Sequence, residues 1–169
     1  MNYNLESIPT YKLDNYKIDQ ICKLKDTKWK FGLKSQKIWF KKNIKNKDIH
    51  NSLYLGTKII GYTLLRIRTC KKKDKKITKY ILFDTLIVDN KYRNKKISNL
   101  IMLFNNLIIK EKRYFAFLTC QNTLVDFYKK KGWRRINKKK FELVDHKFQS
   151  NGMTYNFNEK QKLFLYTNI

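Results

Sequence analysis

The sequence has few residues that break secondary structure or could form disulfide bonds. Its 169 residues include one proline, one alanine, five glycines and three cysteines. An odd number of widely separated cysteines (Cys22, Cys70 and Cys120) argues against a disulfide-rich secreted module. It favours an intracellular, reducing compartment, either the cytoplasm or an organelle matrix. No apolar run approaches the ~20 residues of a membrane-spanning helix, and the first residues lack the layout of a secretory signal, so we expect no membrane span.

Acidic residues are also scarce. Thirteen Asp and Glu face 39 Lys and Arg, which gives a net charge of +26. Disorder does not explain this excess, because 42% of the residues are hydrophobic and 15% are aromatic. A field this positive attracts polyanions such as nucleic acid or an anionic membrane. The abundant Lys, Asn, Ile, Phe and Tyr have AT-rich codons, and we hypothesise that an AT-rich gene accounts for part of the lysine.

The hydrophobic pattern predicts one domain over residues 1–169, because no linker or repeat divides the chain. The predicted order is two helices, three antiparallel strands, a helix, a strand, a helix and two or three further strands. The predicted ranges are helices 14–25 and 35–46 (the second capped by Ser35), strands 52–57, 58–68 and 78–88, helix 97–110, strand 115–120, helix 122–131 and a last strand 162–167. Apolar residues follow the helical period over 97–110 and predict its buried stripe: Ile97, Leu100, Ile101, Phe104, Leu107 and Ile108. The central strand–helix–strand unit implies a parallel strand pair, so the fold class is α/β (α+β), with a mixed sheet and helices on both faces.

The stretch from Ile81 to Ile101 carries the clearest chemistry. A strand ends at Val88, a turn follows, and a helix opens near Lys96. Backbone amides at a helix N-terminus bind anions such as phosphate, and Arg93, Lys95 and Lys96 add positive charge there. An ordinary strand-to-helix turn with solvated lysines is the alternative.

This stretch resembles the central motif of the GNAT superfamily of acetyl-CoA-dependent N-acetyltransferases. In that motif a strand ends in Val, and Arg/Gln-x-x-Gly-x-Gly/Ala opens the next helix. A second segment, Phe127–Trp133 (Phe-Tyr-Lys-Lys-Lys-Gly-Trp), is similar to the family's Phe-Tyr-x-Lys-x-Gly-Phe. The resemblance covers about residues 50–137. It implies a GNAT-like mixed, mostly antiparallel sheet with a central parallel strand pair and helices on both faces.

The resemblance also implies acetyl-CoA as acyl donor and a role for each matching residue. The main chain at Leu86 and Val88 would pair with the pantetheine arm. The turn would hold the pyrophosphate through Arg93, Asn94, Lys95, Lys96, Ile97 and Ser98. Gln121 and Asn122 lie at or beside the position of an asparagine that is frequent in the family.

Two residues are the expected catalytic groups. Tyr128 would donate a proton to the leaving thiolate, and Asp84, the only acid in residues 80–88, would deprotonate the amine. The alternatives are a core aromatic for Tyr128 and a paired structural acid for Asp84. Lys96 and Ser98 replace the family's glycines, so the Lys96 side chain either crowds the phosphate site or pairs with a phosphate. Asn94, which tolerates unusual backbone angles, relieves part of the turn strain.

Other constellations are weak. His50 and His146 are isolated, and no Cys, His and carboxylate cluster has metal spacing, so we expect no metal. Cys120 is expected to be a buried, inert thiol, because no histidine lies near it in the sequence.

The basic runs suggest where a polyanion would bind. They are Lys71–Lys76, Lys129–Lys131 with Arg134 and Arg135, and Lys138–Lys140. One function class is an N-acetyltransferase whose acceptor amine is on or near RNA or a ribonucleoprotein. Another is an inactive GNAT-fold subunit of an RNA-rich assembly such as a ribosome. A small-molecule acetyltransferase is a third, which would not require this charge.

Overall fold

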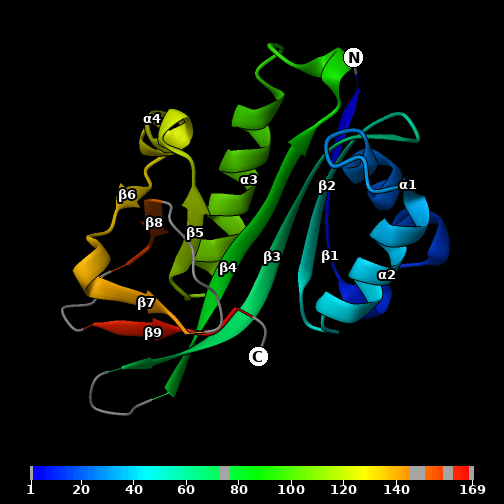
Figure 1. Cartoon of the computed structure of the whole chain (residues 1–169). Coiled ribbons are helices and arrows are strands. Elements are labelled where there is room, and N and C mark those ends of the chain that lie inside the picture. The colour runs from blue at the N-terminus through cyan, green and yellow to red at the C-terminus, as the bar shows by residue number, and fades with distance from the viewer. Residues whose placement is uncertain (1, 73–76, 145–150, 158–161, 168–169) are drawn as a thin grey trace. The chain divides into compact units, whose positions relative to one another are not determined.

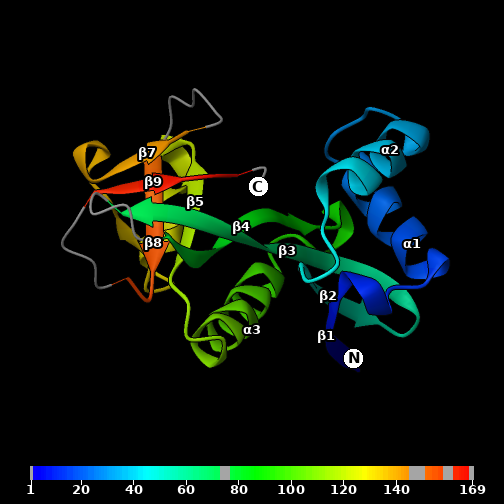
Figure 2. The same ribbon diagram turned by 90° about the horizontal axis from the view of Figure 1, so that it is seen from below.

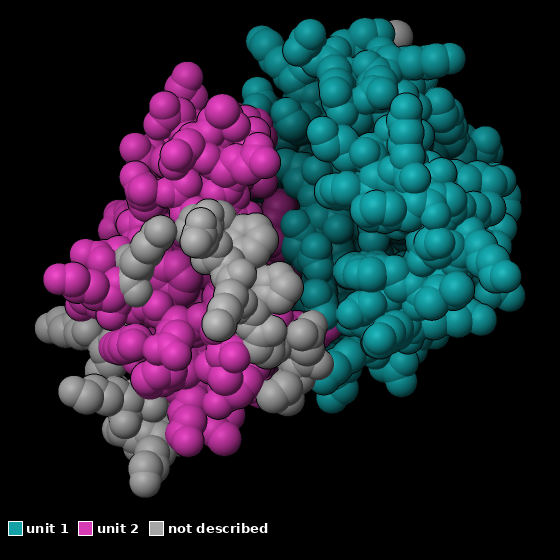
Figure 3. Space-filling model, viewed as in Figure 1, with its two compact units in different colours: residues 1–66, 84–105 teal, residues 67–83, 106–169 magenta. Residues whose placement is uncertain are grey.

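The computed structural model describes residues 2–72, 77–144, 151–157 and 162–167, which belong to two compact units. Unit 1 comprises residues 1–66 and 84–105, and unit 2 comprises residues 67–83 and 106–169 (Figure 3). Two strands and one helix run from one unit into the other. The expectation of a single domain stays a prediction. Within the described residues, no helix is long and apolar enough to cross a membrane.

The sheet of unit 1 is antiparallel at its start. Strand β1 (Tyr3–Pro9) pairs with β2 (Ile49–Leu55), and β2 pairs with the first part of β3 (Lys58–Lys72). Gly56, at φ 58°, lies in the tight turn between β2 and β3, where the sequence predicts one. Strand β4 (Ile77–Val88) follows β3 in the sheet order. Strand β1 was not predicted, and β3 runs past the predicted end at residue 68.

Helices cover both faces of this sheet, as predicted (Figures 1 and 2). On one face, α1 (Asn15–Asp26) and α2 (Leu33–Asn43) pack around the buried Tyr62, Leu64 and Ile87. The other face is covered by α3 (Ile97–Glu111) through Ile97 and Ile101. The predicted cap of the second helix is wrong: α2 begins directly after Gly32, whose φ of 82° suits glycine, and Ser35 lies inside the helix.

The buried stripe of α3 differs from the predicted one. Leu107 is 57% exposed, whereas Asn105 is fully buried. The Asn105 side-chain oxygen accepts hydrogen bonds from Nδ2 of Asn51 at 2.7 Å and from Oγ1 of Thr63 at 2.9 Å. These partners on β2 and β3 satisfy the amide, so an asparagine occupies a position where the helical period predicts an apolar side chain.

Unit 2 contains two parallel strand pairs, a central one and a peripheral one. Strand β5 (Ala116–Cys120) lies parallel to β4 and antiparallel to β8 (Asn151–Tyr155), which also pairs with β6 (Arg134–Arg135). Strand β9 (Leu163–Leu165) lies antiparallel to β3 and parallel to β7 (Phe141–Leu143), which is the peripheral pair. The predicted helix 122–131 is shorter: a 3-10 turn (Asn122–Leu124) leads into α4 (Val125–Lys129). The mixed, mostly antiparallel sheet with a central parallel pair is confirmed.

Candidate functional site

The turn between β4 and α3 in unit 1 has the geometry of an anion site. The Asp89 side chain accepts a hydrogen bond from the Lys91 amide at 3.0 Å and so begins a 3-10 turn over Asn90–Tyr92. Helix α3 then starts at Ile97. Between them, Asn94 and Lys96 have φ angles of 63° and 58°. Both therefore lie in the left-handed region, where residues other than glycine are uncommon.

The amides of this turn are available to a ligand. Arg93 still donates its backbone N–H to the Asn90 carbonyl at 3.3 Å, but the amides of residues 94–98 donate to no residue that the structure describes. Arg93, Asn94, Lys95 and Lys96 are exposed, Ser98 is half-buried and Ile97 is buried. Free amides and cations at the start of a long helix favour phosphate binding. The structure thus brings the predicted cofactor residues 93–98 into one turn.

The end of β4 supplies the other predicted residues of unit 1. The half-buried side chains of Leu86 and Val88 pack into the core under α3. The Asp84 carboxylate pairs with the Arg66 guanidinium, with 2.9 Å between Oδ2 and Nη1. Arg66 also donates to the Asn43 carbonyl at 3.1 Å. Asp84 is therefore a paired acid, which is one of its two predicted alternatives, and 25% of its side chain is still exposed.

Asp84 also lines a cavity of about 380 Å³ in unit 1. Its other walls include Trp29 and Phe31, from the segment between α1 and α2, and Trp39 on α2. Lys25 on α1 completes them, although its side chain is almost fully buried. Sequence reasoning missed Lys25. The signal was present, because Lys25 follows the partly buried Ile18 and the buried Ile21 and Cys22 in helical steps of three or four residues.

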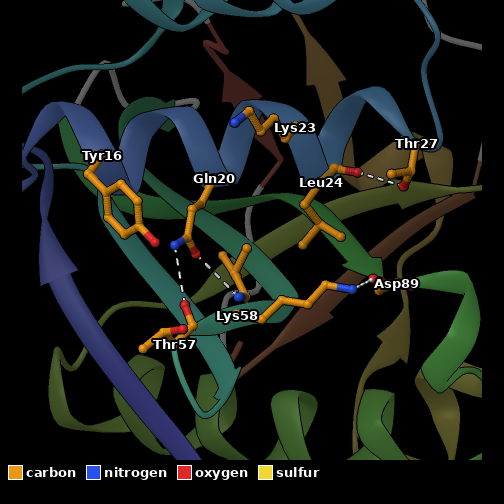
Figure 4. A pocket seen from close by; sticks show the side chains of 9 residues that line it. Tyr16, Gln20, Lys23, Leu24, Thr27, Thr57, Lys58 and Asp89 are labelled. Atoms are coloured by element: carbon orange, nitrogen blue, oxygen red, sulfur yellow. Dashed lines mark hydrogen bonds and ion pairs between the residues drawn. The ribbon is translucent and has the colours of Figure 1, made fainter.

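A second cavity, of about 400 Å³, lies beside α1 (Figure 4). Gln20 spans it, donating to the Thr57 carbonyl at 3.2 Å and accepting from the Ile59 amide at 3.2 Å. Lys58 pairs with Asp89 at 2.7 Å across its rim. None of the predicted site residues lines this cavity. Gln20, Lys58 and Asp89 are therefore engaged in hydrogen bonds or an ion pair within this region.

Tyr128 lies in α4 of unit 2. It is 7% exposed and packs edge-on against Phe83, with ring centroids 6.3 Å apart. The Trp133 ring also packs against Tyr128, with 6.1 Å between ring centroids. Trp133 is held by a hydrogen bond from its Nε1 to Oδ1 of Asn106 at 3.1 Å. Burial, aided by the nearby Cys120, raises the pKa of Tyr128 above its ordinary range, so the phenol keeps its proton. The Tyr128 hydroxyl donates its proton to no hydrogen-bond partner among the described residues.

The remaining candidates of unit 2 lie near α4 in sequence. Gln121 and Asn122 are exposed, and the Asn122 side-chain oxygen accepts from Asn151 Nδ2 at 2.7 Å. Cys120 is buried, and burial raises the pKa of its thiol, which is the state of an inert cysteine.

The basic runs are described in part. Lys129, Lys130, Arg134, Arg135 and Lys139 are exposed, and Lys129 pairs with Asp126 at 3.5 Å. The tip of the first run, residues 73–76, lies outside the described residues.

Among the residues that the structure describes, no group of three His, Cys, Asp or Glu could hold a metal. His50 is fully buried and has ring-nitrogen hydrogen bonds to Thr10 and Tyr62, at 2.9 and 2.8 Å. His146 lies outside the described part.

Comparison with known proteins shows similarity in structure alone. No family model matches the sequence, and no curated protein matches it either. The structure is similar to an acetyltransferase of the GNAT family from Staphylococcus aureus, with a TM-score of 0.59 and 12% identity over 89% of this chain and 98% of that one. It is similar to the PaiA N-acetyltransferase from Thermoplasma acidophilum in complex with coenzyme A, with a TM-score of 0.58 and 15% identity over 93% and 100%. It is also similar to the ribosomal-protein-S18-alanine N-acetyltransferase from Escherichia coli, with a TM-score of 0.61 and 8% identity over 99% and 96%. The chain therefore has the fold of the GNAT superfamily of N-acetyltransferases.

Proposed function

We propose that the protein transfers an acetyl group from acetyl-CoA to a primary amine. The observation that carries this proposal is the left-handed backbone at Lys96, where the GNAT motif has glycine. Lysine holds a φ of 58° there, although the left-handed conformation costs a residue with a Cβ roughly 1–2 kcal/mol. A simple strand-to-helix turn does not require that cost. A turn that wraps its amides around a pyrophosphate does, which supports acetyl-CoA binding.

The residues of the turn fit the cofactor's charged part. The unoccupied amides of residues 94–98 would hold the pyrophosphate, and the exposed Arg93, Lys95 and Lys96 would add charge. The main chain at Leu86 and Val88 would pair with the pantetheine arm, and Gln121 and Asn122 are proposed as further contacts. When bound, acetyl-CoA supplies an activated acyl group as its thioester.

Two side chains would move protons in the transfer. Asp84 would accept one proton from the acceptor's ammonium group. The amine nitrogen would then bond to the acetyl carbon in place of sulfur. Tyr128 would give its proton to the departing thiolate and recover one from the nitrogen. The Tyr128 phenol is protonated at neutral pH, as a donor must be, although burial raises its pKa and makes it a weaker acid.

Calorimetry with acetyl-CoA, followed by turnover with a panel of primary amines, tests this function. Tyr128→Phe is expected to bind acetyl-CoA as the wild type does and to lose roughly 10²–10⁴-fold in kcat. Tyr155→Phe is the matched control, because Tyr155 stacks on the same Trp133, with 5.6 Å between ring centroids, and is not a site candidate. Absence of saturable binding at about millimolar acetyl-CoA contradicts the proposal.

A catalytically inactive GNAT-fold subunit of an RNA-rich assembly is the second candidate. It is favoured by the side chains at Lys96 and Ser98, where the motif has small residues. The same experiment separates the two, since an inactive subunit would show no turnover with any amine.

We also propose a polyanionic partner such as RNA or a ribonucleoprotein. The exposed Lys130, Arg134, Arg135 and Lys139 of unit 2 support it, together with the net charge of +26. One structural neighbour acts on a ribosomal protein, which is compatible with such a setting. Binding of a labelled RNA should weaken steeply with salt and weaken further in an Arg134→Gln/Arg135→Gln variant. Lys112→Gln/Arg113→Gln is the control of equal charge. No RNA binding at low salt contradicts this partner.

A further inference from the structure

The described lining of the cavity of about 380 Å³ carries one cation, Lys25, and one carboxylate, Asp84. Lys25 is 6% exposed, and its ammonium group lies 3.5 Å from the centroid of the Trp39 ring. No carboxylate of the described residues pairs with it. Burial lowers the pKa of Lys25, and the nearby Asp84 opposes that shift. A buried cation with only an aromatic ring as partner leaves room for an anion.

Among the described residues that line the cavity, Asp84 supplies the carboxylate, and Arg66 shares it. Asp84 pairs with Arg66, whose side chain is 7% exposed and is not part of the described lining, so one carboxylate serves both Arg66 and the lining residue Lys25. Within the described residues, the buried Nε of Arg66 also has no hydrogen-bond partner. Burying charge is costly unless it is balanced, so a negative group beside Lys25 is favoured.

Another part of the lining is aromatic, and the segment that carries it is held in place. Trp29 and Phe31 are 36% and 71% exposed, which is unusual for side chains of their size. The buried Gln36 donates from Nε2 to the Trp29 carbonyl at 2.7 Å, and Asp26 accepts from the Gly32 amide at 2.8 Å. The segment that carries the two aromatic residues is therefore anchored at both ends. It presents apolar surface to a ligand.

We propose that this cavity binds the acceptor as a small zwitterion with an apolar body. Its primary amine faces Asp84, its carboxylate pairs with Lys25, and its apolar group lies against Trp29 and Phe31. The substrate class is then that of an α-amino acid with an apolar side chain. That the bound amino acid is the acceptor rests on the proposed function. Its binding to Lys25, Asp84 and the aromatic side chains depends only on the cavity.

Three probes that differ by one charged group test the recognition. They are L-phenylalanine, phenethylamine, which lacks the carboxylate, and 3-phenylpropionate, which lacks the amine. Binding is measured by tryptophan fluorescence and by calorimetry, without acetyl-CoA. L-phenylalanine is expected to bind at least about tenfold more tightly than phenethylamine, since a hydrogen bond to a charged group contributes that much.

Lys25→Met tests the residue itself. Methionine has a similar length and is compatible with a buried position. Replacing Lys25 with methionine should reduce the preference for L-phenylalanine over phenethylamine to about onefold. Lys23→Met removes the same charge from an exposed position of the same helix and should leave the preference unchanged. Thermal melts of both variants report whether they fold.

The outcomes separate the two proposals. If acetyl-CoA binds while the wild type prefers phenethylamine or shows no preference, the zwitterion inference is wrong and the proposed function stands. If L-phenylalanine binds in a Lys25-dependent way and acetyl-CoA does not bind, the proposed function is wrong and the recognition stands. A preference that survives in Lys25→Met overturns the assignment of Lys25.

Discussion

Replacing Lys96 with glycine should stabilise the protein, although it removes a side chain. Lys96 has a φ of 58°, and the left-handed conformation costs a residue with a Cβ roughly 1–2 kcal/mol. Glycine avoids that cost but loses about 0.5–1 kcal/mol through its greater freedom in the unfolded chain. The net gain expected for Lys96→Gly is therefore about 0.5–1 kcal/mol. In a chain of 169 residues this raises Tm by about 1–4 °C.

The matched control is Lys95→Gly. Lys95 is equally exposed and carries the same charge, but its φ is not positive. This variant has the entropy cost of glycine without any relief of strain, so it should lose about 0.5–1 kcal/mol. Urea denaturation at equilibrium measures both changes. If Lys96→Gly is no more stable than Lys95→Gly, the reasoning from the left-handed turn is refuted.

The same pair of variants examines the cofactor site. Both lose one positive charge near the proposed pyrophosphate, so the difference between them isolates the backbone. Because glycine at position 96 lets the chain approach a phosphate more closely, we expect Lys96→Gly to bind acetyl-CoA more tightly than Lys95→Gly. Calorimetry at two salt concentrations separates this effect from the shared loss of charge. Weaker binding by Lys96→Gly would mean that the lysine side chain itself contacts the cofactor.

Three further changes have expected magnitudes. Gly61→Ala would place a Cβ against Cδ1 of Ile101 and should lower the free energy of unfolding by about 1–3 kcal/mol. Ile101→Val removes that Cδ1 atom and should recover part of the loss in the double variant. If it recovers nothing, Cδ1 of Ile101 is not the atom that the new Cβ meets. Burial lowers the pKa of His50 to about 4, so the folded state loses about 1.4 kcal/mol of stability per pH unit as the pH falls from about 6.5 towards 4. His50→Gln should therefore show a flatter dependence of unfolding free energy on pH. Identical pH dependences for the two proteins would refute this. Asp84→Ala should cost about 2–3 kcal/mol in urea, because it leaves the buried Arg66 unpaired, and Arg66→Met in the same chain should recover part of it.

The central part of the fold could be predicted closely from the sequence. The strand predicted over 78–88 is β4, Ile77–Val88, and the helix predicted over 97–110 is α3, Ile97–Glu111. Both have strong apolar patterns, and the turn between them is short, so local periodicity is sufficient there. The candidate residues 93–98 were predicted together for the same reason, since they are consecutive in one turn.

Other features depend on partners distant in sequence. Strand β1 has no strong apolar alternation and is held by its pairing with β2, some 45 residues later in the chain. Asn105 is buried because Asn51 and Thr63 hydrogen-bond to it, and no pattern within a helix reveals such partners. Arg66, likewise, reads as one of many cations until its ion pair with Asp84 is seen.

The positions of the cations bear on the origin of the charge. Drift towards lysine codons is tolerated where lysine costs little, on exposed surface, and there it carries no information about function. Burying a cation costs several kcal/mol, so drift alone does not retain one. Lys25, Arg66 and Arg68 are 6%, 6% and 1% exposed. Arg66 is bound by Asp84 and Arg68 by the Thr167 carbonyl, at 3.0 Å, so each has a structural reason to be there. Within the described residues, Lys25 has the Trp39 ring as its direct partner, and it lines an open cavity together with Asp84, which is already paired with Arg66. Of these three buried cations, Lys25 is therefore the one whose position most requires a ligand.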